Sequence, residues 1–195
     1  RTTDDLPEVI YAREYDAAIS PNGNIPVHAF NLISPTFFAN SSTGNKYSLW
    51  VNVYGVSERY LNVYGEKDLR AQMNQFFHRT YTHPVDGTTL DMKMLCNWYW
   101  YDETAILETG KGTKDWNFYR YAETLLSAAE AIAQSSGVNA EAAGYLAQVK
   151  ARANMEGKDV STIASELQRL GKQAFIEECW KERLREFPLE MKIWD

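Results

Sequence analysis

The chain has 195 residues, which is long enough for one domain with a substantial hydrophobic core. Its formal net charge of −6 argues against a nucleic-acid partner, because the phosphate backbone demands a basic protein surface. The 2 cysteines fit neither a disulfide framework nor a zinc site, and no apolar run is long enough to span a membrane.

The first part of the chain is rich in turn-forming residues. A strand is expected around Val9 to Tyr11, and it leads into a less regular segment. Residues 20–48 hold clusters of Pro, Gly, Asn and Ser, which predict long loops of the kind that often carry function. Residues 47–64 alternate between apolar and polar side chains and are compatible with either an edge strand or a helix.

The middle of the chain mixes helical and extended patterns. The apolar spacing over 68–78 predicts a helix, and residues 80–91 read as a turn around Pro84 and Gly87. Residues 92–101 read as a strand with many large side chains. Residues 111–113 form a loop that leads into a helical region.

From Asp115 onwards the pattern is helical. Asp115 is a suitable N-cap, and Gly137 lies where a first helix would end in the left-handed conformation. Asn139 can cap a second helix that closes near Gly157. The two helices therefore form a tight antiparallel hairpin.

A third helical stretch follows and ends at Pro188, whose ring cannot continue a helix. Gly171 lies within this stretch, so the sequence is compatible with either one helix or two helices separated at Gly171. Helix–turn–helix units with small contact residues are typical of tetratricopeptide-type superhelices, although the strict motif is absent. The expected fold is mainly α, with a tetratricopeptide-like helical scaffold over 115–195 and a loop-rich, partly β region over 1–114.

An aromatic run over 98–101 is the clearest functional candidate. In a strand, Trp98 and Trp100 share one face, and flat aromatic faces stack on the C–H faces of sugar rings. Trp50 and Tyr54 are candidates for the same platform. The alternative is that these large side chains belong to the hydrophobic core. The candidate ligand-binding residues are Trp50, Tyr54, Trp98 and Trp100.

Catalytic and metal-binding patterns are weak. Asp102, Glu103 and Glu108 are the carboxylates closest to the aromatic run, but nothing marks the pair with a set separation that a glycosidase needs. His78 and His83 lack the supporting ligands of a metal site. We therefore expect no catalytic residue, no metal and no cofactor.

Motifs in the helical region resemble those of the SusD/RagB family. The run Arg120–Glu123 resembles the start of that family's first C-terminal helix, and residues 146–153 resemble its next helix. Residues 182–190, followed by Trp194 and Asp195, resemble a third family segment. Upstream, residues 8–11 and 67–70 weakly match shorter landmarks of the family.

The resemblance implies a surface lipoprotein that captures nutrients, usually oligosaccharides. It implies a SusD-like α/α superhelix that sits as a lid on a SusC-like TonB-dependent transporter of the outer membrane. It also implies attachment by an N-terminal lipid outside this chain, which we expect to be the C-terminal portion of a longer protein. By this reading the protein is not an enzyme. The alternatives are a peptide-binding member of the family, an all-α glycan-degrading enzyme, and a helical scaffold for protein partners.

The charged residues of the family motifs have two interpretations. They form either a polar ligand site or ion pairs that hold helices and loops together. We favour the structural role, because charges on packed helices pair with each other and breaking a buried pair costs about 3–5 kcal/mol. These residues are Arg120, Glu123, Glu130, Arg152, Glu182, Arg183 and Glu186.

Overall fold

A computed structural model of the chain describes residues 6–16, 18–19, 56–83, 87–99, 101–102, 112–188, 190 and 192. The chain divides into two compact units. The first, here called the mixed unit, comprises Arg1–Asp5, Ala12–Leu61 and Ala71–Trp116. The second, here called the helical unit, comprises Leu6–Tyr11, Asn62–Arg70 and Asn117–Asp195. The boundary at residue 114 that the sequence suggests stays a prediction.

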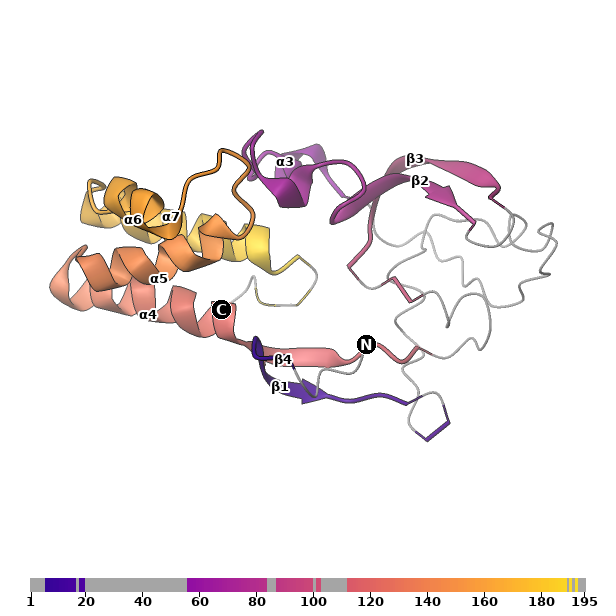
Figure 1. The fold of residues 1–195 in the computed structure, drawn as a ribbon, viewed down its shortest axis with the longest axis horizontal. Coiled ribbons are helices and arrows are strands. Elements are labelled where there is room, and N and C mark those ends of the chain that lie inside the picture. Colours follow the sequence, from indigo (N-terminus) through magenta and orange to yellow (C-terminus); the bar gives the residue numbers. More distant parts are fainter. Residues whose placement is uncertain are drawn as a thin grey trace. The chain divides into compact units, whose positions relative to one another are not determined.

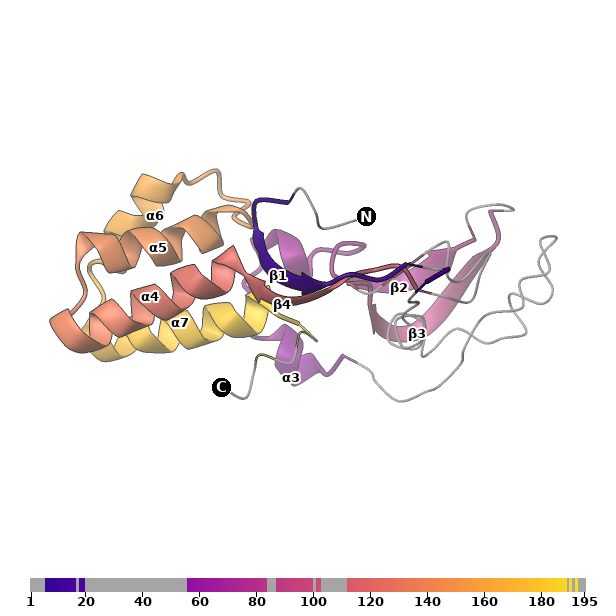
Figure 2. The same cartoon turned by 90° about the horizontal axis from the view of Figure 1, so that it is seen from below.

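The helical unit is built from α4 (Tyr121–Ser136), α5 (Ala140–Ala151), α6 (Val160–Leu167) and α7 (Lys172–Glu186). In Figure 2 the helices lie side by side in the order α6, α5, α4, α7. Figure 1 shows that α6 and α7 form a layer over the antiparallel hairpin of α4 and α5. Such stacked helical hairpins agree with the predicted tetratricopeptide-like scaffold.

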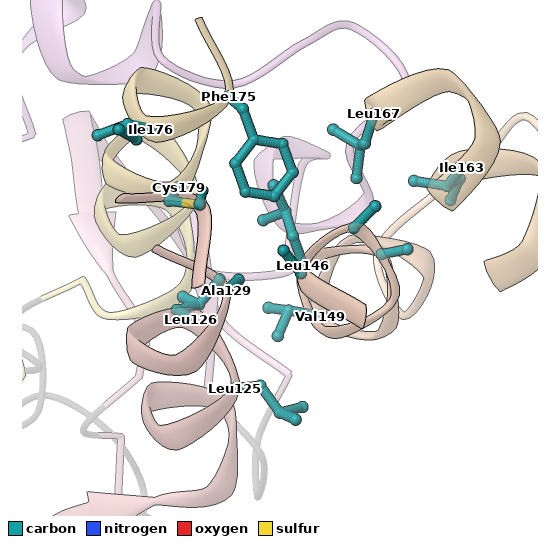
Figure 3. Close-up of a cluster of buried hydrophobic side chains, with 14 of the residues drawn as sticks. Leu125, Leu126, Ala129, Leu146, Val149, Ile163, Leu167, Phe175, Ile176 and Cys179 are labelled. Atoms are coloured by element: carbon teal, nitrogen blue, oxygen red, sulfur yellow. The ribbon is translucent and has the colours of Figure 1, made fainter. Parts of the chain in front are cut away.

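Small residues let these helices approach closely around one apolar core. Ala129 and Leu126 of α4 are fully buried, as is Leu146 of α5. Phe175 of α7 points toward Leu146 and fills the space between the layers (Figure 3). A buried aromatic side chain of this size makes a large contribution to the hydrophobic stabilisation.

Several predicted helix boundaries are confirmed. Gly137 ends α4 with φ 81°, a value that glycine adopts without strain, and the Asn139 side chain accepts a hydrogen bond from Ala142 N at 2.9 Å. Gly171 precedes α7, so the last helical stretch is divided into α6 and α7. Helix α5 ends at Ala151, somewhat before Gly157.

The predicted N-cap at Asp115 is wrong. Residues Trp116–Arg120 form strand β4, and α4 begins only at Tyr121. Strand β4 pairs with β1 (Val9–Arg13), which the sequence did predict as a strand. The Asp115 carboxylate accepts a hydrogen bond from Tyr15 N at 2.9 Å instead of capping a helix. Pairing with a strand more than a hundred residues away therefore overrides the local helical pattern.

The predicted helix over 68–78 is also wrong. The structure has a short 3₁₀ helix at Leu69–Ala71, followed by strand β2 (Phe77–Thr82). Strand β2 pairs antiparallel with β3 (Thr89–Asn97), with an irregularity between His78 and Thr80. The connection contains Gly87 with φ 74°, as the predicted turn requires. Within residues 47–64, the short helix α3 covers Glu58–Leu61, and residues 20–55 lie outside the described part.

Within the described residues, no helix is both long and apolar enough to cross a membrane.

Candidate functional site

An aromatic-lined cleft of about 290 Å³ lies on the β2–β3 hairpin of the mixed unit. Antiparallel pairing places His78 opposite Cys96, and the chain leaves β3 after Asn97 so that Trp98 follows directly. The backbone N–H of Trp98 donates to Phe76 O at 2.7 Å, which fixes the indole next to β2. The residues that line the cleft are Asn74, His78, Thr80, Tyr81, Thr82, Trp98 and Tyr101.

Ring stacking organises this cleft. The Trp98 indole stacks with the His78 imidazole at a centroid distance of 4.2 Å and an interplanar angle of 11°. It also stacks with the Tyr101 ring at 4.8 Å and 15°. Tyr81 is buried and lies tilted against Trp98 at 5.6 Å. The rings hold one another in place, so their half-buried parts form a preorganised apolar wall.

The polar groups of the cleft are hydroxyls and one carboxamide. Thr80 and Thr82 are exposed on β2, and the hydroxyl oxygens of Thr82 and Thr89 lie 3.2 Å apart. Asn74 has φ 65° in the tight turn before β2, a conformation that Asn tolerates better than most residues. Burial lowers the pKa of His78, although hydrogen bonds to the backbone of Gln75 and Asn74 oppose this effect. The cleft therefore offers neutral partners to a ligand.

The structure describes only part of the predicted aromatic platform. Trp98 lines the cleft, whereas Trp50, Tyr54 and Trp100 lie outside the described residues. Strand β3 ends at Asn97, and Tyr101 N donates to Trp98 O at 3.0 Å in a turn. The strand alternation predicted for 98–101 is therefore wrong, and Tyr101 comes back to stack on Trp98 because of that turn.

Sequence reasoning missed His78, Tyr81 and Tyr101 as partners of Trp98. The incorrect helix over 68–78 hid the strand that carries His78, and only the β2–β3 pairing brings it to Trp98. The alternation of β2 could have revealed this face, because His78 and the exposed Thr80 and Thr82 recur at every second position.

Asp102, the acidic residue nearest to the aromatic run, binds a backbone N–H group of a nearby segment. Asp102 Oδ2 accepts a hydrogen bond from Thr113 N at 2.8 Å. Lys114 Nζ donates to the carbonyl oxygens of Tyr99 and Tyr101. Glu103 and Glu108 lie outside the described residues. Among the described residues, no group of His, Cys, Asp and Glu side chains could hold a metal ion.

A buried ionic network lies in the helical unit and contains several family-motif charges. Arg120 donates to Glu8 at 2.6 Å, to Glu186 at 3.0 Å and to Glu190 at 2.7 Å. Arg70 donates to Asp68 at 2.7 Å, to Glu182 at 2.9 Å and to Glu186 at 2.9 Å. Burial opposes the charge of Arg70, but these carboxylates outweigh it and raise its pKa.

The other motif charges also have partners in the helical unit. Arg152 donates to Glu186 at 2.7 Å, and Glu123 pairs with Lys192. Glu130 accepts from Trp180 Nε1 at 3.0 Å, and Arg183 donates to Ser127 Oγ at 2.6 Å. These contacts join residues far apart in sequence and favour an architectural role, which stays an interpretation. Glu8, Arg70 and Glu190 lie within the runs that resemble the family, but they were not among the charged residues to which the sequence analysis gave a structural role.

The chain is similar to proteins of the SusD family in both sequence and fold. The SusD family model matches residues 36–195. A SusD superfamily protein from Parabacteroides distasonis ATCC 8503 superposes with a TM-score of 0.73 at 23% identity, covering 94% of this chain and 37% of that chain. A SusD superfamily protein from Bacteroides fragilis NCTC 9343 superposes with a TM-score of 0.61 at 19% identity, and the match covers 96% of this chain and 39% of that chain. No curated protein matches the chain.

These matches confirm both the resemblance read from the motifs and the predicted mainly helical, partly β fold. The chain spans 37% and 39% of the lengths of the two solved relatives.

Proposed function

This chain belongs to the SusD family, and on that premise we propose that it forms part of a cell-surface protein that binds oligosaccharides as nutrients. In this proposal an N-terminal lipid outside the chain attaches the protein to the outer membrane. The captured ligand then passes to a SusC-like TonB-dependent transporter, which imports it. Family membership is the support for these roles.

The aromatic cleft on β2–β3 is the proposed ligand site. The observation that carries this proposal is the stacking of Trp98 with His78 and Tyr101 beside exposed threonine hydroxyls and the Asn74 carboxamide. Sugar rings present C–H faces and hydroxyls together, so they need apolar plates next to neutral donors and acceptors. Trp50, Tyr54 and Trp100 remain proposed as further members of this site.

We propose recognition without bond cleavage. A glycosidase needs two carboxylates across the scissile bond, one of them with a raised pKa. Asp102, the described carboxylate next to the aromatic run, accepts hydrogen bonds from Thr113. These hydrogen bonds support a structural role for Asp102 in fixing the segment around Thr113.

The test is calorimetric titration of the chain with a panel of neutral oligosaccharides. We expect Trp98→Ala to weaken binding roughly tenfold, because a lost stacking partner removes about 1–1.5 kcal/mol. The matched control is Trp180→Ala, which removes an exposed tryptophan from α7 of the helical unit. Circular dichroism checks that both variants are folded. Equal weakening in the two variants, or no saccharide binding by the wild type, contradicts the proposal.

Two further measurements separate the alternatives. Binding of a peptide panel in place of oligosaccharides would indicate the peptide-binding kind of family member. A reducing-sugar assay on the same glycans would reveal turnover if the protein were an enzyme. If neither sugars nor peptides bind while a protein partner does, the helical scaffold hypothesis is the better one.

A further inference from the structure

A second cleft, of about 460 Å³, lies entirely within the helical unit. Its walls come from the segment 65–70, the end of α5 with the turn that follows, α6 and α7. Backbone hydrogen bonds hold the walls together, since Leu69 N donates to Ala153 O at 2.8 Å and Met155 N donates to Lys67 O at 3.0 Å. This is the volume range of sites for small molecules.

The walls of this polar cleft carry equal numbers of basic and acidic side chains. Of the described residues that line it, only Ala153 and Ile163 are aliphatic. An apolar ligand would therefore cover charged groups without replacing their hydration, which is unfavourable. The chemistry of the cleft calls for a ligand that can donate and accept many hydrogen bonds.

Many of these charges are already held in ion pairs. Glu182, whose side chain is 1% exposed, accepts from Arg70 at 2.9 Å and from Arg185 at 3.1 Å. Lys158 pairs with Glu166 at 2.9 Å in the more exposed part of the cleft. A ligand with its own net charge would compete with one member of each pair and repel the other. A neutral ligand adds hydrogen bonds without disturbing the balance.

Arg185 has donor capacity left for such a ligand. Its Nε donates to Val63 O at 2.5 Å, and its Nη1 donates to Glu178 at 2.8 Å and Glu182 at 3.1 Å. Within the part of the chain that the structure describes, its Nη2 has no acceptor. A guanidinium held by three bonds is preorganised, so a ligand hydroxyl that accepts from Nη2 does not have to order the side chain.

We propose that this polar cleft is a second ligand site, which binds a neutral polyhydroxylated molecule of one or two sugar rings. Ligand hydroxyls accept from Arg185 Nη2 and donate to the remaining lone pairs of the wall carboxylates. The site uses charge-assisted hydrogen bonds and no aromatic stacking. It is separate from the Trp98 cleft and does not depend on the function proposed for that cleft.

The cleft can be blocked without removing any of its ion pairs. Gly65 lines the wall, and a Cβ added there would meet nothing within 4 Å. We therefore expect Gly65→Leu to fold normally and to occupy part of the cleft. The matched control is Gly171→Leu, where a Cβ also meets nothing within 4 Å and which precedes α7 away from the walls. Equal urea midpoints would show that the variants are folded alike.

Chemical-shift titration of the labelled chain with maltose and cellobiose tests the site. We expect saturable shifts of the amides of 65–70 and 182–185, with at least tenfold weaker binding in Gly65→Leu. Gly171→Leu and Trp98→Ala should leave these shifts unchanged. Glucuronic acid and glucosamine, as charged comparators, should bind more weakly at these amides.

Three results would overturn this proposal: no saturable shift at these amides, shifts that persist in Gly65→Leu, or tighter binding of either charged sugar. Failure of the Trp98 site would appear separately, as a lack of shifts in residues 78–101. The two proposals are therefore tested by the shifts of different amides and by different variants.

Discussion

Arg120 donates twice to Glu186, a residue 66 positions away: Nη1 reaches Oε1 and Nη2 reaches the backbone carbonyl oxygen, each at 3.0 Å. The other carboxylate oxygen of Glu186 accepts from Arg70 at 2.9 Å. Both the Arg120 and Glu186 side chains are 9% exposed. One carboxylate at the end of α7 is thus shared by Arg120 at the end of β4 and by the segment that carries Arg70.

Removing Arg120 should strongly destabilise the helical unit. In Arg120→Met the buried Glu190 carboxylate loses both of its hydrogen bonds from Arg120, and Glu186 loses one of its three arginine partners, so we expect a loss of about 3–5 kcal/mol in the free energy of unfolding. Urea denaturation, monitored by circular dichroism, measures this change in the free energy of unfolding. Arg169→Met, at an exposed position, is the control and should change stability by less than about 0.5 kcal/mol. A similar small change in Arg120→Met would show that the network is not structural.

Acid should weaken this network. Burial opposes ionisation of Glu8, but hydrogen bonds and charges from Arg152 and Arg120 outweigh it, so its pKa is lowered from 4.5. The same balance, with Lys150 and Arg185 as partners, lowers the pKa of Glu178. A lowered pKa in the folded state contributes stability above the ordinary glutamate value, and that stability is lost as pH falls through the folded-state pKa.

The urea midpoint should therefore fall as the pH is lowered from neutral to below 4.5, the ordinary value for Glu8. Glu8→Gln should make this pH dependence shallower, because one of the titrating carboxylates is gone. Glu177→Gln, at an exposed position of α7, serves as the control and should leave the slope as in the wild type. An unchanged slope in Glu8→Gln would contradict the assignment.

The two cysteines should behave as inert buried thiols. The sequence left their state open; in the structure Cys96 and Cys179 are both buried thiols, and neither forms a disulfide. Burial raises the pKa of each thiol to about 12, and nearby carboxylates add to the effect at Cys179. We expect very slow reaction with a thiol reagent near pH 8 in the folded chain and rapid reaction of both in urea. Fast labelling of the folded chain would show that these sites are open.

The cap of α5 should contribute a modest and specific stabilisation. Asn139 Oδ1 accepts from Ala142 N at 2.9 Å, and we expect Asn139→Ala to cost about 1 kcal/mol in a thermal or urea unfolding experiment. Asn139→Asp keeps the acceptor and should cost little, since both residues cap helices well. If both substitutions destabilise equally, the side chain is needed for something other than capping.

The candidate site shows where reading the sequence succeeded and where it failed. Trp98 was recognisable as an aromatic side chain suited to sugars, because that inference needs only its chemistry. Its partners His78 and Tyr81 were not found, since they lie on β2, whose sequence has helical spacing up to His78. The alternation of His78, Thr80 and Thr82 was present in the sequence, but it competed with the helical spacing, and only the pairing of β2 with β3 decides that this stretch is a strand.

The amino-acid sequence alone determined the helical scaffold, the ends of its hairpin at Gly137 and Asn139, and the family. Periodicity, capping and glycine conformation depend on neighbours within a few residues, so they can be read from the chain directly. Only the tertiary structure decided that Trp116–Arg120 is a strand, that Glu186 is shared by Arg70 and Arg120, and that Trp98 stacks on His78. Each of these depends on residues that meet only after folding, where pairing and burial outweigh local preference.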